Sequence, residues 1–184
     1  MRLQPLAIAL FPTLISTHPL IPRQTSPGPG DTLQEGWYWI RAVAAPNYHK
    51  YLQTQPTNTA GAAVLGSYTT AGQYAVQDGQ LVANTGSGSA PLYLQVSRPA
   101  AGTDPPPRTL ATAFSDTEND FGTFAFQGDA LTWSAPEVER QNEAAWLVCA
   151  GQELFINTGA YGYETPAGCA DQTIHYYNDV HASE

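Results

Sequence analysis

Three histidines are the side chains of this chain best suited to proton transfer. His49, His175 and His181 carry imidazoles, which titrate near neutral pH and can serve as a general base. None stands beside a recognisable nucleophile or an orienting carboxylate motif. The chain also has no Gly-x-Ser-x-Gly elbow, no His-Glu-x-x-His motif and no phosphate-binding loop. A hydrolase of a familiar kind is therefore disfavoured, and we expect a structural or surface position for each histidine.

The aromatic side chains of this chain are its best candidates for a binding site. The chain has 10 Tyr and 4 Trp, and flat rings with polar edges suit the faces of sugars or planar apolar ligands. Most rings must fill the core, but Tyr161 and Tyr163 stand in a Gly-rich loop and are expected to be exposed. The predicted ligand-binding residues are Tyr51, Trp133, Tyr161, Tyr163 and Tyr176. If the protein is an enzyme, the catalytic candidates are His49, Tyr163 and His175.

Two cysteines, Cys149 and Cys169, are the only thiols of the chain. An even number of cysteines in an oxidising compartment usually pairs, so we expect one disulfide. It would close a loop of about twenty residues and stabilise the fold by about 3 kcal/mol in the chain-entropy model. A zinc site or a nucleophilic thiol is the weaker interpretation, because no histidine stands at ligand spacing.

The acidic turn at residues 116–120 is the one candidate for a cation site. Asp116, Glu118 and Asp120 stand at alternate positions, a spacing that can place carboxylate oxygens around calcium. The turn lacks the glycine and the terminal glutamate of an EF-hand loop. We therefore interpret it as a solvated hairpin turn and predict no metal and no other cofactor.

The charge balance excludes one class of partner. Sixteen acidic and seven basic residues give a net charge of −9, and the basic residues are scattered. Without a basic patch, nucleic-acid binding is not expected. A membrane is not an expected partner either. The aromatic residues favour a glycan or a small apolar molecule as the partner; the family resemblance given below implies that the glycan is one of the cell wall.

Three segments divide the chain. Residues 1–17 have the basic start, apolar run and small polar end of a secretory signal peptide. Residues 18–35 form a Pro-rich lead that we expect to be flexible. Residues 36–184 are long enough for one domain with its own core. These features predict a secreted protein.

One short pattern occurs three times, at residues 74–81, 124–131 and 146–154. Each copy reads as a strand, a tight turn with glycine and a return strand. Straight-chain helix formers are scarce, and only residues 137–145 have some helical character. The pattern predicts an all-β, single-domain antiparallel sandwich or barrel.

The order of these features resembles the PhiA-like family of fungal secreted cell-wall proteins, also described as IgE-binding-protein-like. The resemblance rests on residues 74–81, 124–133 and 145–149 and on Cys169, over about the last two thirds of the chain. It implies a small secreted β-protein at the fungal wall or surface and carries no active-site residue. The chain departs from that pattern in lacking earlier cysteines and in its elaborated loop at residues 160–168.

A second similarity points to the β-trefoil as the alternative architecture. Residues 38–43, followed by residues 50–52, are similar to the repeat opening of β-trefoil lectins. Three hairpins would suit that three-fold fold. The three copies, however, are unevenly spaced, whereas trefoil repeats are nearly equal in length.

Two functional hypotheses follow. The first is a secreted, wall-associated β-protein that binds a glycan or small ligand weakly through aromatic loops. The alternative is a small β-barrel enzyme of fungal secondary metabolism, such as a cyclase, a dehydratase or a pericyclase of the hetero-Diels-Alderase kind, acting on an apolar polyketide or terpenoid. The alternative requires one cavity lined by His49, Tyr51, Trp133, Tyr163, His175 and Tyr176.

Overall fold

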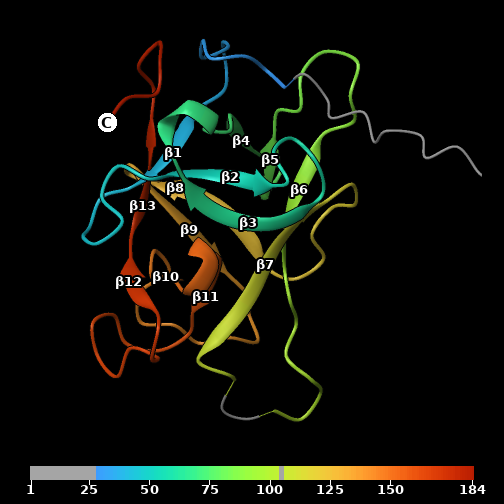
Figure 1. The fold of residues 1–184 in the computed structure, drawn as a ribbon. Coiled ribbons are helices and arrows are strands. Elements are labelled where there is room, and N and C mark those ends of the chain that lie inside the picture. The colour runs from blue at the N-terminus through green and yellow to red at the C-terminus, as the bar shows by residue number, and fades with distance from the viewer. Residues whose placement is uncertain (1–27, 104–105) are drawn as a thin grey trace, which may run out of the picture.

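Short alternating segments separated by Gly-containing turns form an antiparallel β-structure in the computed structural model, which describes residues 28–103 and 106–184 (Figure 1). The strands are β1 (Trp39–Ala42), β2 (Tyr51–Gln55), β3 (Gly61–Gly66), β4 (Tyr74–Gln77), β5 (Gln80–Ala83), β6 (Leu92–Val96), β7 (Thr109–Ser115), β8 (Thr123–Gln127), β9 (Ala130–Ser134), β10 (Trp146–Val148), β11 (Leu154–Asn157), β12 (Ala170–Gln172) and β13 (Ile174–Tyr177). Two 3₁₀ turns, η1 (Tyr68–Thr70) and η2 (Ala150–Gln152), complete the elements. The predicted all-β antiparallel fold, a sandwich or a barrel, is confirmed in its barrel form.

Six of the strands form a nearly closed ring. Strand β1 pairs with β13, β13 with β9, β9 with β8, and β4 with β5. Two further contacts close the ring. Tyr38 and Tyr74 exchange backbone hydrogen bonds of 2.8 Å between β1 and β4, and the Phe124 amide of β8 donates to the Gly79 carbonyl at the start of β5.

Three hairpins cover one end of this ring. They are β2–β3, β6–β7 and β10–β11. Each hairpin contacts the next, because β3 pairs with β7, β7 pairs with β11, and Val64 of β3 bridges to Glu153 beside β11. A six-stranded ring capped by three mutually paired hairpins is the connectivity of a β-trefoil, the alternative architecture of the sequence analysis.

The spacing argument against the trefoil was wrong because the hairpin at residues 146–154 is not the third copy of the repeat. That hairpin belongs to the cap. In the ring, β4–β5 pairs Val76 with Leu81, and β8–β9 pairs Phe126 with Leu131. Their counterpart pairs Tyr176 of β13 with Ile40 of β1. The third copy is therefore split between the two ends of the domain, and its two strands meet only in the folded protein.

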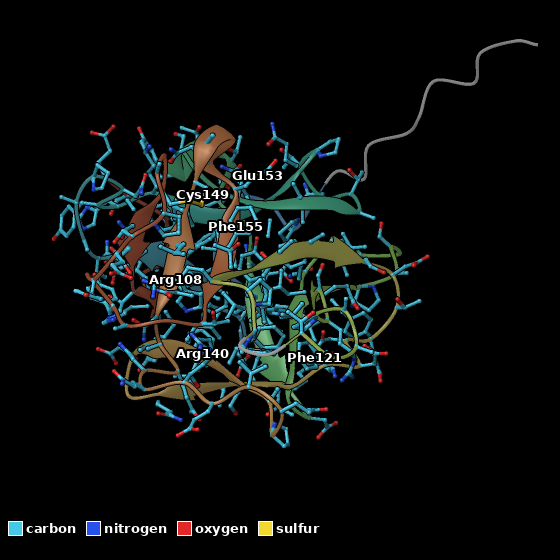
Figure 2. All side chains as sticks on the ribbon, turned by 90° about the horizontal axis from the view of Figure 1, so that it is seen from below. Arg108, Phe121, Arg140, Cys149, Glu153 and Phe155 are labelled. Carbon is cyan, nitrogen blue, oxygen red and sulfur yellow. A yellow bond between two sulfur atoms is a disulfide. The ribbon has the colours of Figure 1, made fainter. Side chains whose placement is uncertain are left out.

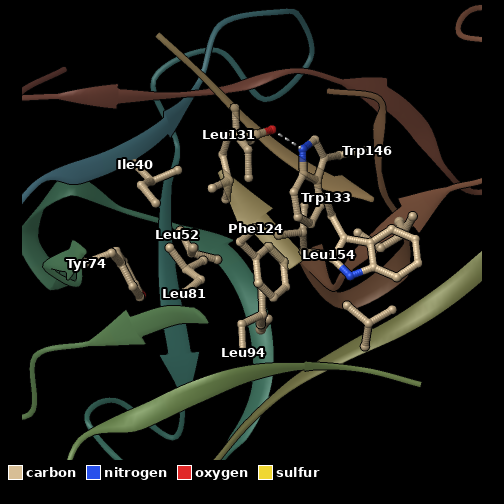
Figure 3. Close-up of a cluster of buried hydrophobic side chains, with 14 of the residues drawn as sticks. Ile40, Leu52, Tyr74, Leu81, Leu94, Phe124, Leu131, Trp133, Trp146 and Leu154 are labelled. Carbon is tan, nitrogen blue, oxygen red and sulfur yellow. Dashed lines mark hydrogen bonds between the residues drawn. The ribbon is translucent and has the colours of Figure 1, made fainter. Parts of the chain in front are cut away.

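The core fills the space between the ring and its cap. Figure 3 shows Leu52 and Leu94 of the cap hairpins facing Leu81 and Phe124 of the ring. The Trp146 indole is fully buried and donates to the Leu131 carbonyl at 2.9 Å. Each buried side chain of this size contributes about 1.5–3 kcal/mol through removal from water. The alternation of apolar and polar residues on these strands is thus what holds the hairpins to the ring.

Local structure differs from the sequence expectations at the start of the domain. The folded region begins before Gly36, because the Leu33 amide donates to the Val180 carbonyl and the buried Gln73 side-chain amide bonds the backbone of the lead. Between β3 and β4 the chain forms η1, in which the Ser67 hydroxyl accepts from the Thr69 amide. Residues 137–145 contain no helix, in agreement with the all-β prediction. The predicted signal peptide, residues 1–17, lies outside the described residues.

Candidate functional site

Two of the predicted ligand-binding residues lie in the core. The Tyr51 side chain is fully buried, and its hydroxyl donates to the Ser183 carbonyl at 2.7 Å. The Trp133 side chain is also fully buried, and its indole donates to the Phe121 carbonyl at 2.9 Å. Neither ring presents a face to solvent. Both therefore stabilise the fold and are not open to a ligand in this structure.

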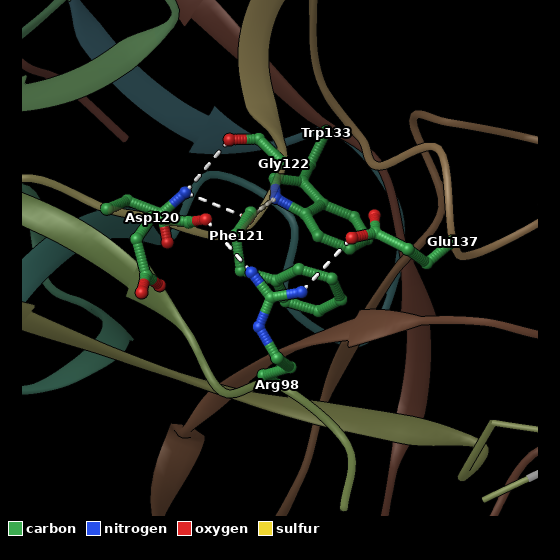
Figure 4. Close-up of polar contacts among 7 residues, drawn as sticks. Arg98, Asp120, Phe121, Gly122, Trp133 and Glu137 are labelled. Carbon is green, nitrogen blue, oxygen red and sulfur yellow. Dashed lines mark hydrogen bonds and ion pairs between the residues drawn. The ribbon is translucent and has the colours of Figure 1, made fainter. Parts of the chain in front are cut away.

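The Phe121 segment is held by an arginine on its outer side (Figure 4). The Arg98 guanidinium carbon lies 4.3 Å from the centre of the Phe121 ring. Arg98 also donates to the Asp120 carbonyl and pairs with Glu137, each at 3.1 Å. Its guanidinium and the Trp133 indole thus fix the end of the acidic turn.

The acidic turn itself is organised by the side-chain amide of Asn119. The buried Asn119 side chain donates to the carbonyls of Phe121 and Gly122 and accepts from the Val96 amide. The Asp116, Glu118 and Asp120 side chains remain exposed. Within residues 28–103 and 106–184, no three His, Cys, Asp or Glu side chains gather closely enough to hold a metal ion.

Tyr161 and Tyr163 are exposed, by 42% and 63%. Their loop is held from inside by Arg108, which donates to the carbonyls of Ala160 and Tyr163 at 2.8 and 2.7 Å. Partial burial, and secondarily the Asp171 carboxylate, raises the pKa of Tyr161. Figure 2 labels Arg108 and, above it in that view, Cys149. Neither tyrosine lines the two hollows described next.

His175 and Tyr176 lie together in a surface hollow of about 340 Å³. Both belong to β13, and Asp129 of the β8–β9 turn lies beside them. A hydrogen bond to the Asp129 carboxylate is the main cause that raises the pKa of the Tyr176 hydroxyl. His49 lies in a different hollow, so the six residues of the enzyme hypothesis do not share one cavity.

The lining residues of the hollow that contains His49 are the best suited to bind a ligand. It is an open groove of about 590 Å³, which we call the Tyr48 groove. Its lining residues are mainly aromatic or hydrogen-bonding: Tyr48, His49, Lys50, Leu65, Gly66, Ser67, Tyr68, Gln152 and Glu184. Tyr48 is 61% exposed and Tyr68 is 38% exposed, so both keep ring surface in contact with water.

The loop between β1 and β2 positions Tyr48 and His49. Their rings stack with centres 4.0 Å apart and planes 20° apart. The backbone of His49 is left-handed, with φ of 58°, and its amide donates to the Ala42 carbonyl at 3.0 Å. Non-glycine residues in this conformation are uncommon and concentrate at turns and functional sites. The folded loop thus supports the Tyr48 ring on the His49 imidazole, while Tyr48 stays 61% exposed.

Tyr68 is positioned by a turn that Gln53 fastens to β2. In the amide orientation that satisfies its neighbours, the Gln53 nitrogen donates to the Thr70 carbonyl at 3.0 Å, and its oxygen accepts from the Gly66 amide. A Cβ on Gly66 would lie 1.4 Å from the end of the Gln53 side-chain amide, so a larger residue at position 66 would displace that side chain from its hydrogen bonds. Both contacts hold η1 against the barrel and set the Tyr68 ring beside the groove.

The polar end of the groove comes from a distant part of the chain. Gln152 ends η2 with a left-handed backbone, φ of 63°, and its side chain accepts from the Lys50 ammonium at 2.7 Å. The residue before η2, Cys149, forms the predicted disulfide with Cys169. The disulfide therefore ties the base of η2 to β12 and restricts where Gln152 can lie.

The sequence analysis selected His49 from this groove but missed Tyr48, Tyr68 and Gln152. Tyr48 follows Pro46-Asn47, and Tyr68 follows Gly66-Ser67. An aromatic residue directly after turn-forming residues is a signal for an exposed ring and would have selected both. Nothing local marks Gln152, because it reaches the groove only through tertiary contacts.

No helix in the described part of the chain is long and apolar enough to cross a membrane. No family model matches this sequence, and comparisons with curated proteins and with solved structures found no significant match either.

Proposed function

We propose that this protein is a secreted, glycan-binding β-trefoil protein and that the Tyr48 groove is its binding site. The observation that carries the proposal is the stacked pair of Tyr48 and His49, with Tyr48 61% exposed. Exposing this much ring surface to water is unfavourable in free energy. A ligand that covers the rings removes that surface from water. Proteins normally place aromatic rings of this size in the core or at an interface.

The chemistry of the groove favours a sugar over an apolar molecule. A pyranose has an apolar face of C–H groups that stacks on a flat ring, and hydroxyl groups around its edge that need donors and acceptors. Tyr48 and Tyr68 supply the rings, and Lys50, Gln152 and Ser67 supply hydrogen-bonding groups. An apolar polyketide would need an enclosed apolar cavity, whereas this groove is open and has Leu65 as its one aliphatic lining residue.

Two further observations support an extracellular role. The Cys149–Cys169 disulfide is of the kind that persists in oxidising compartments. The net charge of −9 suits a protein that stays dispersed outside the cell. With the resemblance to PhiA-like proteins, they support a location in the medium or at the fungal wall, where polysaccharides are the abundant ligands.

The proposal is tested by binding of the secreted protein to insoluble polysaccharides, chitin, β-1,3-glucan and mannan, followed by calorimetry with matching oligosaccharides. Tyr48→Ala and Tyr68→Ala are expected to weaken binding by about tenfold each, since stacking on one ring is worth about 1–1.5 kcal/mol. Tyr163→Ala is the control, because it removes an equally exposed ring from another loop. Equal affinities of the Tyr48→Ala and Tyr163→Ala variants, or no binding to any of the polysaccharides, would overturn the proposal.

A further inference from the structure

Another hollow, between β1 and β13, contains a cation that has no acceptor among the described residues. Arg41 lies on the outer face of β1 and lines the hollow of about 340 Å³ with Asp129, His175, Tyr177 and Asn178. Within the described residues its guanidinium makes no hydrogen bond and no ion pair. Its one close contact is the Tyr177 ring, whose centre lies 3.8 Å from the guanidinium carbon.

Arg41 differs in this from the other cations that the structure describes. Each of the others donates to a partner within the chain: Lys50 to Gln152, Arg98 to Asp120 and Glu137, Arg108 to Ala160 and Tyr163, and Arg140 to Trp133, Ala145 and Asn157. Four of the five described cationic side chains thus bond the fold itself. Arg41 is the one among them whose five guanidinium N–H donors have no acceptor in the described chain, so they can bind a ligand.

The guanidinium is held in place although it has no acceptor. The Tyr177 ring lies under it, and the Tyr177 hydroxyl donates to the Asp179 carboxylate, which fixes the ring. Stacking on a tyrosine face orients the plane of a guanidinium and leaves its edge donors free. A fork held in this way is preorganised, so a ligand loses less side-chain entropy in binding it.

A histidine lies directly opposite Arg41 on the neighbouring strand. Arg41 and His175 are opposite residues in the β1–β13 register, and both line the hollow. Opposite side chains on one face of a sheet have Cβ atoms about 4.5–5.5 Å apart, so an anion bound to the guanidinium comes within reach of the imidazole. The Asn178 amide adds a neutral donor at the same edge.

We propose that this hollow binds a carboxylate-bearing ligand through a bidentate contact with Arg41, at a site separate from the Tyr48 groove. The planar fork of arginine matches the two oxygens of a carboxylate or a phosphate. The Asp129 carboxylate on the rim and the net charge of −9 select the singly charged carboxylate over the doubly charged phosphate. The carboxylate belongs either to a sugar acid or to a simple organic acid.

The test is calorimetry of the full protein with sodium glucuronate, N-acetylglycine, neutral methyl glucoside and inorganic phosphate. Both carboxylates are expected to bind and the glucoside is not. Tighter binding of glucuronate identifies a sugar acid as the source, and equal binding identifies the carboxylate alone. Arg41→Lys keeps the charge but loses the fork and is expected to weaken binding by about tenfold, and Arg41→Gln by more.

Two control variants separate this site from other causes. Arg98→Gln removes another exposed guanidinium and should leave carboxylate binding unchanged. Tyr48→Ala should also leave it unchanged, so failure of this proposal and failure of glycan binding are distinguishable. Unchanged binding in Arg41→Gln, or tighter binding of phosphate than of both carboxylates, would overturn the proposal. Thermal unfolding of each variant shows whether the fold is retained.

Discussion

Arg140 is expected to be the most important single cation for the stability of the fold. Its guanidinium is half-buried between β9, β10 and β11 and donates to three carbonyls: Trp133 at 2.5 Å, Ala145 at 2.5 Å and Asn157 at 3.0 Å. Burial lowers its pKa to about 10, and the Glu143 carboxylate opposes that change. Figure 2 shows Arg140 in the lower part of the view, below Arg108.

The Arg140→Met variant retains the apolar stem and removes all three donors. At about 1 kcal/mol net for each hydrogen bond, the free energy of unfolding should fall by about 3 kcal/mol. Arg140→Lys should lose about 2 kcal/mol, because one ammonium cannot reach three carbonyls that converge on a planar fork. Arg98→Met, the exposed counterpart, should lose less than about 1 kcal/mol since its pair with Glu137 is at the surface.

Urea unfolding followed by tryptophan fluorescence measures these differences. Trp133 is a suitable reporter because the Arg140 guanidinium carbon lies 5.6 Å from the centre of its ring. The slope of free energy against urea should be the same in all variants, so that midpoints report stability alone. If Arg140→Met lost no more than Arg98→Met, the reasoning that the three carbonyls depend on this guanidinium would be refuted.

Two further predictions concern tyrosines. The Tyr74 hydroxyl is fully buried and has no hydrogen-bond partner within the described residues. Tyr74→Phe should therefore raise the free energy of unfolding by about 1 kcal/mol, measured by thermal denaturation. A loss of stability would mean that the hydroxyl has a hydrogen-bond partner. Asp129→Asn should lower the pKa of Tyr176 toward its ordinary value, because the carboxylate is the main cause that raises it. The raised pKa contributes stability that is fully present below about pH 10 and is lost as pH rises through the folded-state pKa. The variant should therefore show less alkaline destabilisation, and tyrosinate absorbance in an alkaline titration measures the shift; an unchanged titration curve would contradict the assignment.

The chain's local patterns were enough to predict its structural class. Alternating apolar residues around a Gly turn predicted the hairpins β4–β5, β8–β9 and β10–β11, and all three form. The number and context of the cysteines predicted the Cys149–Cys169 disulfide. These predictions succeed because a hairpin and its turn are decided within about ten residues, by side-chain alternation and by positive φ at glycine.

The arrangement of the hairpins depended on contacts that no local pattern records. The third copy of the repeat joins β13 to β1 from opposite ends of the domain, and the pairing of Tyr176 with Ile40 exists only when the ring closes. Burial of Tyr51 and Trp133 was decided in the same way. Both are residue types that often line binding sites, and only tertiary contacts bury them. Ser183 near the C-terminus lies against Tyr51, whereas Phe121 and Arg140 lie against Trp133.

The candidate sites show the same division between local and long-range information. Exposed rings at Tyr48 and Tyr68 follow from turn chemistry near each residue. The approach of Gln152 to Lys50 requires η2 and the β1–β2 loop to meet. Whether a cation has an acceptor also depends on tertiary contacts. Every other described cation donates to a group on another strand or loop, and Arg41 has no such acceptor among the described residues. Residue types determined which chemistry was available, and the closure of the barrel decided which groups meet.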